Sequence, residues 1–324
     1  MTSKISTKFV DLKHKLRTSR TRIYKVLNGK PLWACQPGVL QIDTTTRRCP
    51  LDCVYCNPQH NFIESSGDLP ISTIEHVASE LQRNKMFINF ARPFMNSEPT
   101  LENRLSKICA ILKKYLGSRI DVFTNGVLYN KRQLLVDKNI DDIRFTISAS
   151  NADLYSEVHG KPLFSKALET LNWVNKNKMA HHRIWVNFVL FDKNAHDLPE
   201  WQKLFAEFKQ DVRVLHYGEN RLTSSTVAKG SEELLQKYRK NMINTIISQE
   251  RPCACFENMA ISYNGRFMQC SDISYEHNCG HVEEIDIKET IAKRLEVGLN
   301  HEGCKGCTQK NPHWKELFEK HVWT

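Results

Sequence analysis

The sequence of 324 residues predicts an α/β fold, in which an open partial barrel of parallel strands is followed by a smaller α+β domain. Two observations predict this fold. Short apolar, β-prone segments alternate with amphipathic helical segments from residue 39 to residue 216, and such alternation is typical of parallel βα units. Beyond residue 226, a helical pattern is followed by a hairpin pattern flanked by cysteines, which indicates a separate small domain.

The strands of the barrel are expected at segments rich in apolar and β-branched residues: Val39–Asp43, Phe87–Phe90, Ile120–Thr124, Ile143–Ser148, Ile184–Leu190 and Val212–His216. The helices are expected where apolar residues recur at helical spacing: Ser72–Asn84, Leu101–Leu116, Lys131–Lys138, Phe164–Lys178 and Leu198–Phe208. In barrels of this kind, functional side chains lie on loops at the carboxyl ends of the strands. We therefore expect the functional site on these loops.

Three parts are expected along the chain: 1–36, 37–225 and 226–324. The first contains a basic amphipathic helix over residues 4–28, the second is the partial barrel, and the third begins with a linker helix over residues 231–249. The basic face of the first helix has two interpretations. It is either the solvated surface of a helix packed on the barrel, or a docking face for an acidic reducing partner such as a flavodoxin or ferredoxin.

Composition limits the class of protein. With 40% hydrophobic and 25% charged residues, no apolar run of membrane-spanning length and no signal-peptide core, we expect a cytoplasmic protein without a membrane partner. The net charge of +10 permits a nucleic-acid partner, but no helix-turn-helix, zinc-finger or RNP-like pattern supports one. Most of the 11 cysteines gather in two groups, which in a reducing compartment indicates metal or iron–sulfur binding rather than disulfides.

The first group lies directly after the first predicted strand, in the segment Cys49-Pro50-Leu51-Asp52-Cys53-Val54-Tyr55-Cys56. Three thiols at this C-x3-C-x2-C spacing on one loop suit a metal ion or an iron–sulfur centre. The segment itself supplies no fourth ligand, and an iron that lacks a protein ligand is free to bind a substrate. The alternative is a structural zinc site that a distant Cys or His completes.

This segment resembles the cluster-binding loop of the radical S-adenosylmethionine (radical SAM) enzymes, whose fold is a partial (β/α)6 barrel. The resemblance implies a 4Fe–4S cluster on Cys49, Cys53 and Cys56, with S-adenosyl-L-methionine (SAM) chelated to the fourth iron. One electron from the cluster would cleave SAM to methionine and a 5′-deoxyadenosyl radical, which would abstract a hydrogen atom from the substrate. Tyr55 fits the aromatic residue that often precedes the third cysteine and lies near the adenine.

Further segments resemble the SAM contacts of this family. Asn96-Ser97-Glu98-Pro99 follows the second predicted strand, where the family has Gly-Gly-Glu-Pro, so Glu98 is expected at the methionine amino group. Asn96 and Ser97 depart from the pattern and make the loop less permissive than two glycines. Thr124-Asn125-Gly126 resembles the family's Thr-Asn-Gly turn.

Two polar residues on later strands complete the expected SAM site. Ser148 is expected near the ribose, with Ser150 as the alternative. Asn187 is a polar residue inside an apolar strand, and a buried amide needs hydrogen-bond partners, either from neighbouring backbone or from SAM. The family pattern favours SAM as the hydrogen-bond partner of Asn187.

The second group of cysteines surrounds the hairpin pattern of Met259–Tyr263, Asn264-Gly265 and Arg266–Cys270. The order of a cysteine, Gly-x4-Cys and a later C-x2-C resembles the SPASM/Twitch extension of radical SAM enzymes. The resemblance implies a second, auxiliary 4Fe–4S cluster whose four ligands are three fixed cysteines and one of two candidates: Cys270, Cys304, Cys307 and either Cys253 or Cys255. A four-cysteine zinc site is the alternative. Cys279 and Cys109 are interpreted as buried, non-ligating residues.

The resemblance implies a radical SAM oxidoreductase in which the auxiliary cluster accepts the electron left after hydrogen abstraction. The expected reaction is dehydrogenation or a related modification of a hydroxylated small molecule. The alternative is crosslinking, epimerisation or oxidation of a peptide or protein. The molybdenum-cofactor enzyme of this superfamily is disfavoured because its Gly-rich C-terminal tail is absent. A non-catalytic iron–sulfur electron carrier or a zinc-binding module is the alternative of another class. No residue is singled out as the catalytic acid or base.

Overall fold

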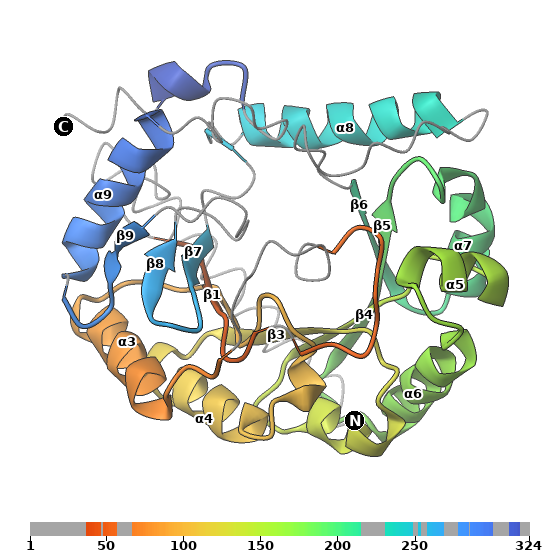
Figure 1. The fold of residues 1–324 in the computed structure, drawn as a ribbon, viewed down its shortest axis with the longest axis horizontal. Coiled ribbons are helices and arrows are strands. Elements are labelled where there is room, and N and C mark those ends of the chain that lie inside the picture. The colour runs from red at the N-terminus through yellow and green to blue at the C-terminus, as the bar shows by residue number, and fades with distance from the viewer. Residues whose placement is uncertain are drawn as a thin grey trace.

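The structure is a computed structural model that describes residues 37–46, 48–56, 67–214, 231–248, 252–253, 258–268, 278–284, 286–300 and 311–317. Its described strands form one nine-stranded sheet in the order β6-β5-β4-β3-β2-β1-β7-β8-β9. The sheet is curved, and helices α3 to α7 cover its outer face (Figure 1). The helix predicted at residues 4–28 lies outside the described residues.

Six neighbouring strands of this sheet are parallel: β1 (Val39–Ile42), β2 (Phe90–Arg92), β3 (Arg119–Thr124), β4 (Asp142–Thr146), β5 (Arg183–Leu190) and β6 (Lys209–Val214). They confirm the predicted α/β partial barrel. The second strand was predicted at Phe87–Phe90 but pairs only from Phe90 onward. Ile88 is buried in the core, so the apolar character of this segment reflects packing ahead of the strand rather than strand pairing.

The helices that cover the parallel strands are α3 (Ile71–Arg83), α4 (Leu105–Leu116), α5 (Ala152–His159), α6 (Phe164–Asn177) and α7 (Leu198–Leu204). The structure differs from the prediction at four places. Helix α4 begins at Leu105 rather than at Leu101, because Pro99–Leu101 form the separate 3₁₀-helix η2. The segment expected as a helix at Lys131–Lys138 is the 3₁₀-helix η3 (Tyr129–Val136), in which only Leu135 is buried, so it lacks the apolar face that stabilises an α-helix. Helix α7 ends early because β6 begins at Lys209. Helix α5 was not predicted.

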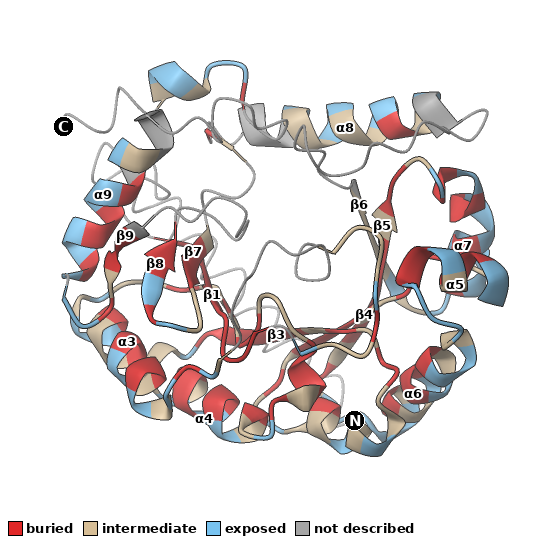
Figure 2. Ribbon diagram, viewed as in Figure 1, coloured by how far each residue is buried: buried red, intermediate tan, exposed pale blue. Residues whose placement is uncertain are grey.

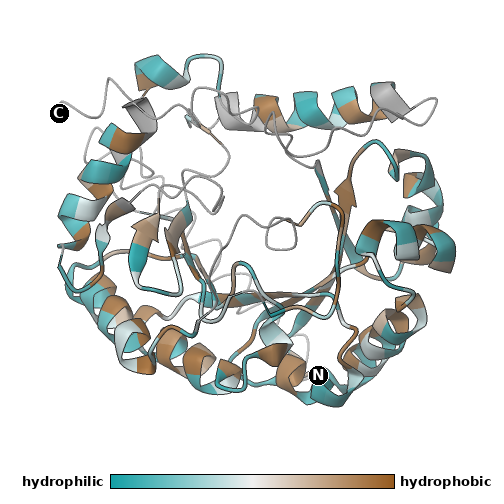
Figure 3. Ribbon diagram, in the orientation of Figure 1, coloured by the Kyte–Doolittle hydropathy of each residue, from teal (hydrophilic) through white to brown (hydrophobic). Residues whose placement is uncertain are grey.

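Helix α4 shows how the sequence builds this outer layer. Its buried residues, among them Ile108, Cys109 and Leu112, lie on one face and pack on the core. Gly117 ends the helix with a φ of 57°, a left-handed conformation that glycine adopts without strain. Figure 2 shows the buried faces of the helices turned toward the sheet, and Figure 3 shows hydrophobic stretches on the same helices. As predicted, Cys109 is a core residue.

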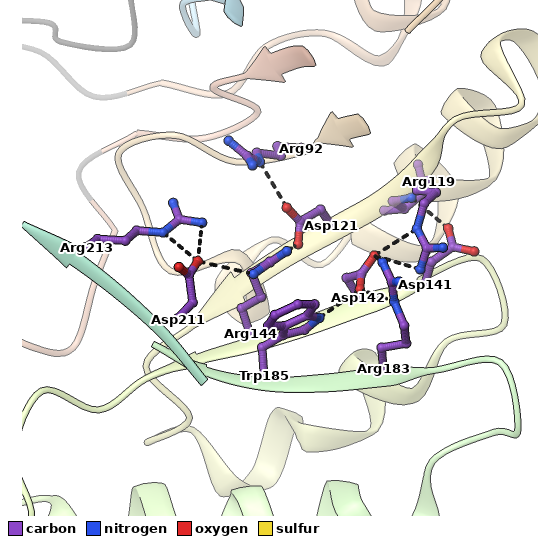
Figure 4. Close-up of polar contacts among 11 residues, drawn as sticks. Arg92, Arg119, Asp121, Asp141, Asp142, Arg144, Arg183, Trp185, Asp211 and Arg213 are labelled. Atoms are coloured by element: carbon purple, nitrogen blue, oxygen red, sulfur yellow. Dashed lines mark hydrogen bonds and ion pairs between the residues drawn. The ribbon is translucent and has the colours of Figure 1, made fainter. Parts of the chain in front are cut away.

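The two faces of the parallel sheet differ in chemistry. On β3, Ile120 and Val122 join the core beneath the helices, whereas Arg119 and Asp121 alternate with them and face the inside of the barrel. The inner face carries two groups of ion pairs, shown in Figure 4. One group joins β2 to β6 through Arg92, Asp121, Arg144, Asp211 and Arg213. The other joins β3, β4 and β5 through Arg119, Asp142 and Arg183. Paired charged groups thus line the inner wall of the barrel, and Arg119, Asp142 and Arg183 lie at the amino ends of their strands.

The C-terminal part extends the same sheet. Strand β7 (Asn258–Ile261) pairs in parallel with β1, and β8 (Arg266–Met268) and β9 (Asn278–His281) follow antiparallel. The predicted hairpin is confirmed, with Gly265 at a φ of 78° in its turn. Strand β9 and helix α9 (Ile287–Asn300) were not predicted, whereas α8 (Ser231–Ser248) was. The division into domains at residues 37–225 and 226–324 stays a prediction. None of the described helices is long and apolar enough to cross a bilayer.

Candidate functional site

The three-cysteine loop lies where the loops after four successive strands meet. The backbone N–H of Glu98, after β2, donates to the carbonyl of Arg48 at 2.7 Å. The side-chain amide of Asn125, after β3, donates to the Sγ of Cys49 at 3.4 Å. The end of α5, which follows β4, contacts the middle of the same loop. Segments far apart in the sequence therefore converge on the loop from the carboxyl ends of the strands, as the fold predicts.

Helix α5 holds the loop through its last two carbonyl groups. The backbone N–H of Asp52 donates to His159 O at 3.1 Å, and that of Val54 donates to Val158 O at 3.0 Å. The last carbonyls of a helix have no partner within the helix, so the loop satisfies them. Gly160 follows at a φ of 74°, and a Cβ there would lie 2.3 Å from Asp52 O. The helix end and the loop therefore lie in direct backbone contact.

Glu98 ties two of these loops together. Its buried carboxylate accepts hydrogen bonds from the N–H and hydroxyl of Thr100, from the hydroxyl of Thr124 and from the N–H of Asn125. Burial raises the pKa of Glu98 against the opposing effect of these donors. The carboxylate thus fixes Asn125, and with it the amide that reaches Cys49. Its predicted contact with SAM stays a prediction.

The predicted SAM residues on the later strands lie close to the loop. Ser148 is fully buried; its hydroxyl accepts a hydrogen bond from the N–H of Val189, and its N–H donates to Nε2 of His159. The ring of Tyr55 packs edge-on against His159 and Phe191, with centroids 5.9 and 6.0 Å away. Tyr55 and Ser148 therefore meet at His159.

Asn187 and Ser97 have buried polar atoms that lack partners. The Oδ1 of Asn187 and the Oγ of Ser97 have no hydrogen-bond partner in the part of the chain that the structure describes. Burying a polar atom without a hydrogen bond costs about 1–3 kcal/mol, and such atoms commonly meet a ligand. Ser150, the alternative to Ser148, instead bonds to the carboxylate of Asp197 through both its N–H and its hydroxyl.

Two residues of this site were missed by the sequence analysis. His159 contacts Cys53, with 3.2 Å between Nδ1 and Sγ, and burial lowers its pKa to about 3, so its ring is neutral. Asp43 pairs with Asn96 and is almost fully buried. The sequence does contain a signal for the short helix that ends at His159, because Asn151 caps its start and Gly160 its end.

The comparisons with known proteins agree with this geometry. A family model described as the Radical SAM superfamily matches residues 44–205, half of the chain. The chain therefore belongs to the radical SAM superfamily, a class of enzymes.

Curated relatives are distant. The chain is 23% identical over 195 residues to the probable GTP 3′,8-cyclase of Thermoplasma volcanium, which covers 59% of this chain and 56% of that protein. It is 25% identical over 181 residues to the PqqA peptide cyclase of Rhodopseudomonas palustris, covering 53% and 46%. The chain thus spans about half the length of these relatives.

Solved structures show the same fold. The structure of anSMEcpe with bound AdoMet has a TM-score of 0.63 at 16% identity and covers 88% of this chain and 96% of that chain. Streptococcus suis SuiB bound to the precursor peptide SuiA has a TM-score of 0.59 at 14% identity, covering 84% and 66%. BtrN in complex with AdoMet and 2-DOIA has a TM-score of 0.51 at 13% identity, covering 83% and 92%.

The three thiols of the loop fit an iron–sulfur cluster. Burial raises the pKa of Cys49 to about 12 and that of Cys53 well above its ordinary value, so thiolates form here only when a cationic centre offsets the cost. No three His, Cys, Asp or Glu side chains among the described residues are arranged around one metal ion. A cluster spreads its cysteine ligands over several irons.

The second cysteine group is only partly visible. Cys253 is partly buried and free of disulfides, and Cys279 is fully buried in β9, as predicted. The remaining proposed ligands lie outside the described residues: Cys255, Cys270, Cys304 and Cys307. The auxiliary cluster therefore stays a prediction.

Proposed function

We propose that this protein is a radical SAM enzyme that binds a 4Fe–4S cluster through Cys49, Cys53 and Cys56 and modifies a peptide by abstracting a hydrogen atom. The observation that carries the proposal is the convergence of the segments after β2, β3 and β4 on the three-cysteine loop after β1, whose own sequence supplies no fourth ligand. When bound, such a cluster reduces SAM by one electron and releases a 5′-deoxyadenosyl radical.

The residues of the chain have separate tasks in this proposal. Asn125 and the end of α5 hold the cysteines in position, and Glu98 orders Asn125. Tyr55 packs beside the space next to the third cysteine, where it would flank the adenine. Asn187 offers a buried acceptor that has no partner among the described residues, which suits an N–H or ammonium donor of SAM. The charged inner wall of the barrel would bind polar groups of the substrate.

Peptide modification is supported by the relatives. Two PqqA peptide cyclases are among the curated relatives, and SuiB bound to its precursor peptide is among the similar folds. This revises the preference for a hydroxylated small molecule. That second candidate, dehydrogenation of a small molecule, is supported by the fold likeness to BtrN with 2-DOIA bound. The GTP 3′,8-cyclase relative supports a nucleotide substrate in the same way.

The test starts with anaerobic reconstitution, followed by addition of dithionite and SAM and measurement of 5′-deoxyadenosine. We expect wild type to form it and Cys56→Ala not to. Cys109→Ala is the matched control, because Cys109 is buried in α4 away from the loop. If wild type forms no 5′-deoxyadenosine, the protein is an electron carrier or a zinc-binding module instead.

The substrate class is tested by stimulation of the same reaction. Pooled synthetic peptides, GTP and an aminocyclitol are added separately, and the formation of 5′-deoxyadenosine is compared with the uncoupled rate. We expect the peptides to stimulate it. Stimulation by the aminocyclitol or by GTP alone would reject the peptide proposal and leave the radical SAM assignment intact.

We further propose an auxiliary 4Fe–4S cluster on Cys270, Cys304, Cys307 and either Cys253 or Cys255, with a flavodoxin or ferredoxin as reductant. Two clusters require about eight irons per chain. Cys307→Ala should lower this to about four and preserve the SAM-dependent signal. Zinc in place of the lost iron would indicate a structural zinc site.

A further inference from the structure

Both ring nitrogens of His159 lie within hydrogen-bond distance of a partner. Nε2 lies 3.0 Å from the backbone nitrogen of Ser148, and Nδ1 lies 3.2 Å from the Sγ of Cys53. The hydroxyl of Tyr55 is further from Nδ1, at 3.5 Å. The histidine thus bridges the end of β4 and the second cysteine of the loop.

The partner at Nε2 decides which nitrogen carries the proton. A backbone N–H can only donate, so Nε2 must accept with its lone pair. A neutral imidazole with a free Nε2 carries its hydrogen on Nδ1. That hydrogen points at Cys53, so the contact is an N–H···S hydrogen bond in which His159 donates.

The ring of His159 is held by burial and by stacking, and the backbone of His159 is held against the cysteine loop. The ring is fully buried and stacks on the ring of Tyr155, with centroids 4.2 Å apart and planes 26° apart. The backbone carbonyl of His159 accepts a hydrogen bond from the N–H of Asp52, and Gly160 allows the end of α5 and the cysteine loop to lie in backbone contact. The ring of His159 therefore cannot turn away from Cys53 without losing both the hydrogen bond from Ser148 and the stacking on Tyr155.

We propose that His159 is a positioning residue that donates an N–H···S hydrogen bond to the Cys53 thiolate and thereby raises the reduction potential of the cluster. The proposal rests on the assignment of Cys53 as a cluster ligand. A donor at a ligand sulfur stabilises negative charge there, and the reduced cluster carries more of it than the oxidised one. Loss of the donor should therefore make the cluster harder to reduce.

Three variants separate the two hydrogen bonds. His159→Asn carries an amide nitrogen near the position of Nδ1 and keeps the donor to sulfur. His159→Gln carries an amide oxygen near Nε2, so it keeps the acceptor for Ser148 and loses the donor. His159→Phe loses both. All variants are made in a Cys307→Ala background, which removes the proposed auxiliary cluster. The reconstituted protein is titrated with reductant at controlled potentials, without SAM, and the EPR signal of the remaining reduced cluster gives the midpoint potential.

We expect His159→Gln and His159→Phe to shift the midpoint potential to more negative values, and His159→Asn to stay near wild type. His182→Gln is the matched control, because His182 is also buried and bonded through both nitrogens, to Met179 N and Asp137 O, but lies outside the site. A midpoint unchanged in both His159→Gln and His159→Phe, at wild-type iron content, would overturn the proposal. Should His159→Phe not fold, the comparison of the Gln and Asn variants still decides.

Failure of the underlying assignment gives a different result. If wild type assembles no cluster, the proposed function falls and the role of His159 falls with it. If wild type assembles the cluster and cleaves SAM while the variants keep its potential, only the role of His159 is rejected.

Discussion

Asn96 donates both its backbone N–H and its side-chain amide to the carboxylate of Asp43, over 3.1 and 3.2 Å. This pair explains why the loop after β2 departs from Gly-Gly at Asn96. The side chain is used to tie the loop to the end of β1, directly before the cysteine loop. Asp43 is 1% exposed, whereas Asn96 is only partly buried.

Asp43 should make the stability of the protein depend on pH. Burial raises its pKa from 3.8 to about 6, against the opposing hydrogen bonds of Asn96. Between these values the folded protein keeps a proton that the unfolded chain has released, so stability falls as pH rises through this window and stays lower above it. The loss amounts to about 3 kcal/mol. Urea unfolding of wild type and Asp43→Asn from pH 4 to 7 measures it. Parallel curves would contradict the assignment.

Replacing Glu98 by Gln should loosen the cysteine loop. Each oxygen of the Glu98 carboxylate accepts a hydrogen bond from a backbone N–H, of Thr100 or of Asn125. The NH₂ group of glutamine replaces one of these oxygens and cannot accept, so at least one hydrogen bond is lost and one donor is left buried. We expect the free energy of unfolding to fall by about 2–3 kcal/mol and the iron content to drop. Glu75→Gln, on the exposed side of α3, should cost about 0.5 kcal/mol and leave iron unchanged. Equal effects of the two variants would refute the link between Glu98 and the loop.

The cysteine loop could be predicted from the sequence because its spacing is local. Glu98 and Asn125 were found by resemblance as part of the SAM site, but their support of the loop was not predicted, and His159 was missed. Glu98, Asn125 and His159 act on the cysteines across long stretches of chain, and their contacts depend on how neighbouring strands are paired. Helix α5 escaped prediction because it is short and surrounded by polar residues. The parallel pairing of β7 with β1 was also invisible, since the hairpin pattern says nothing about a third partner.

The inner wall of the barrel depends on Asp142, which is fully buried between Arg119 and Arg183 and accepts from the indole of Trp185. Burial by itself raises the pKa of Asp142, but hydrogen bonding and charge from the two arginines outweigh it, and the net pKa is lowered. Asp142 therefore stabilises the fold above its unfolded pKa, and this contribution is lost as pH falls toward the lowered value.

Asp142→Asn should cost about 3 kcal/mol, because it leaves the buried Arg119 and the partly buried Arg183 without their carboxylate. The matched variant is Asp211→Asn. The side chain of Asp211 is 31% exposed and pairs with Arg144 and Arg213, so water replaces part of the lost interaction with these arginines. Thermal and urea unfolding at neutral pH compare the two. A smaller loss for Asp142→Asn than for Asp211→Asn would show that the buried network does not stabilise the sheet.

Gly160→Ala separates backbone strain from damage to the site. Alanine at a φ of 74° is strained by about 1 kcal/mol, and its Cβ would collide with Asp52 O, 2.3 Å away. Gly117 ends α4 with a φ of 57° and lies far from the cysteine loop in the sequence. Gly117→Ala therefore introduces backbone strain without a collision with that loop. We expect both variants to lose stability, but only Gly160→Ala to lose iron after reconstitution, because only there must the cysteine loop move. Full iron in Gly160→Ala would mean that the loop can shift away from α5 and still hold its cluster, and that the contact between helix and loop serves stability alone.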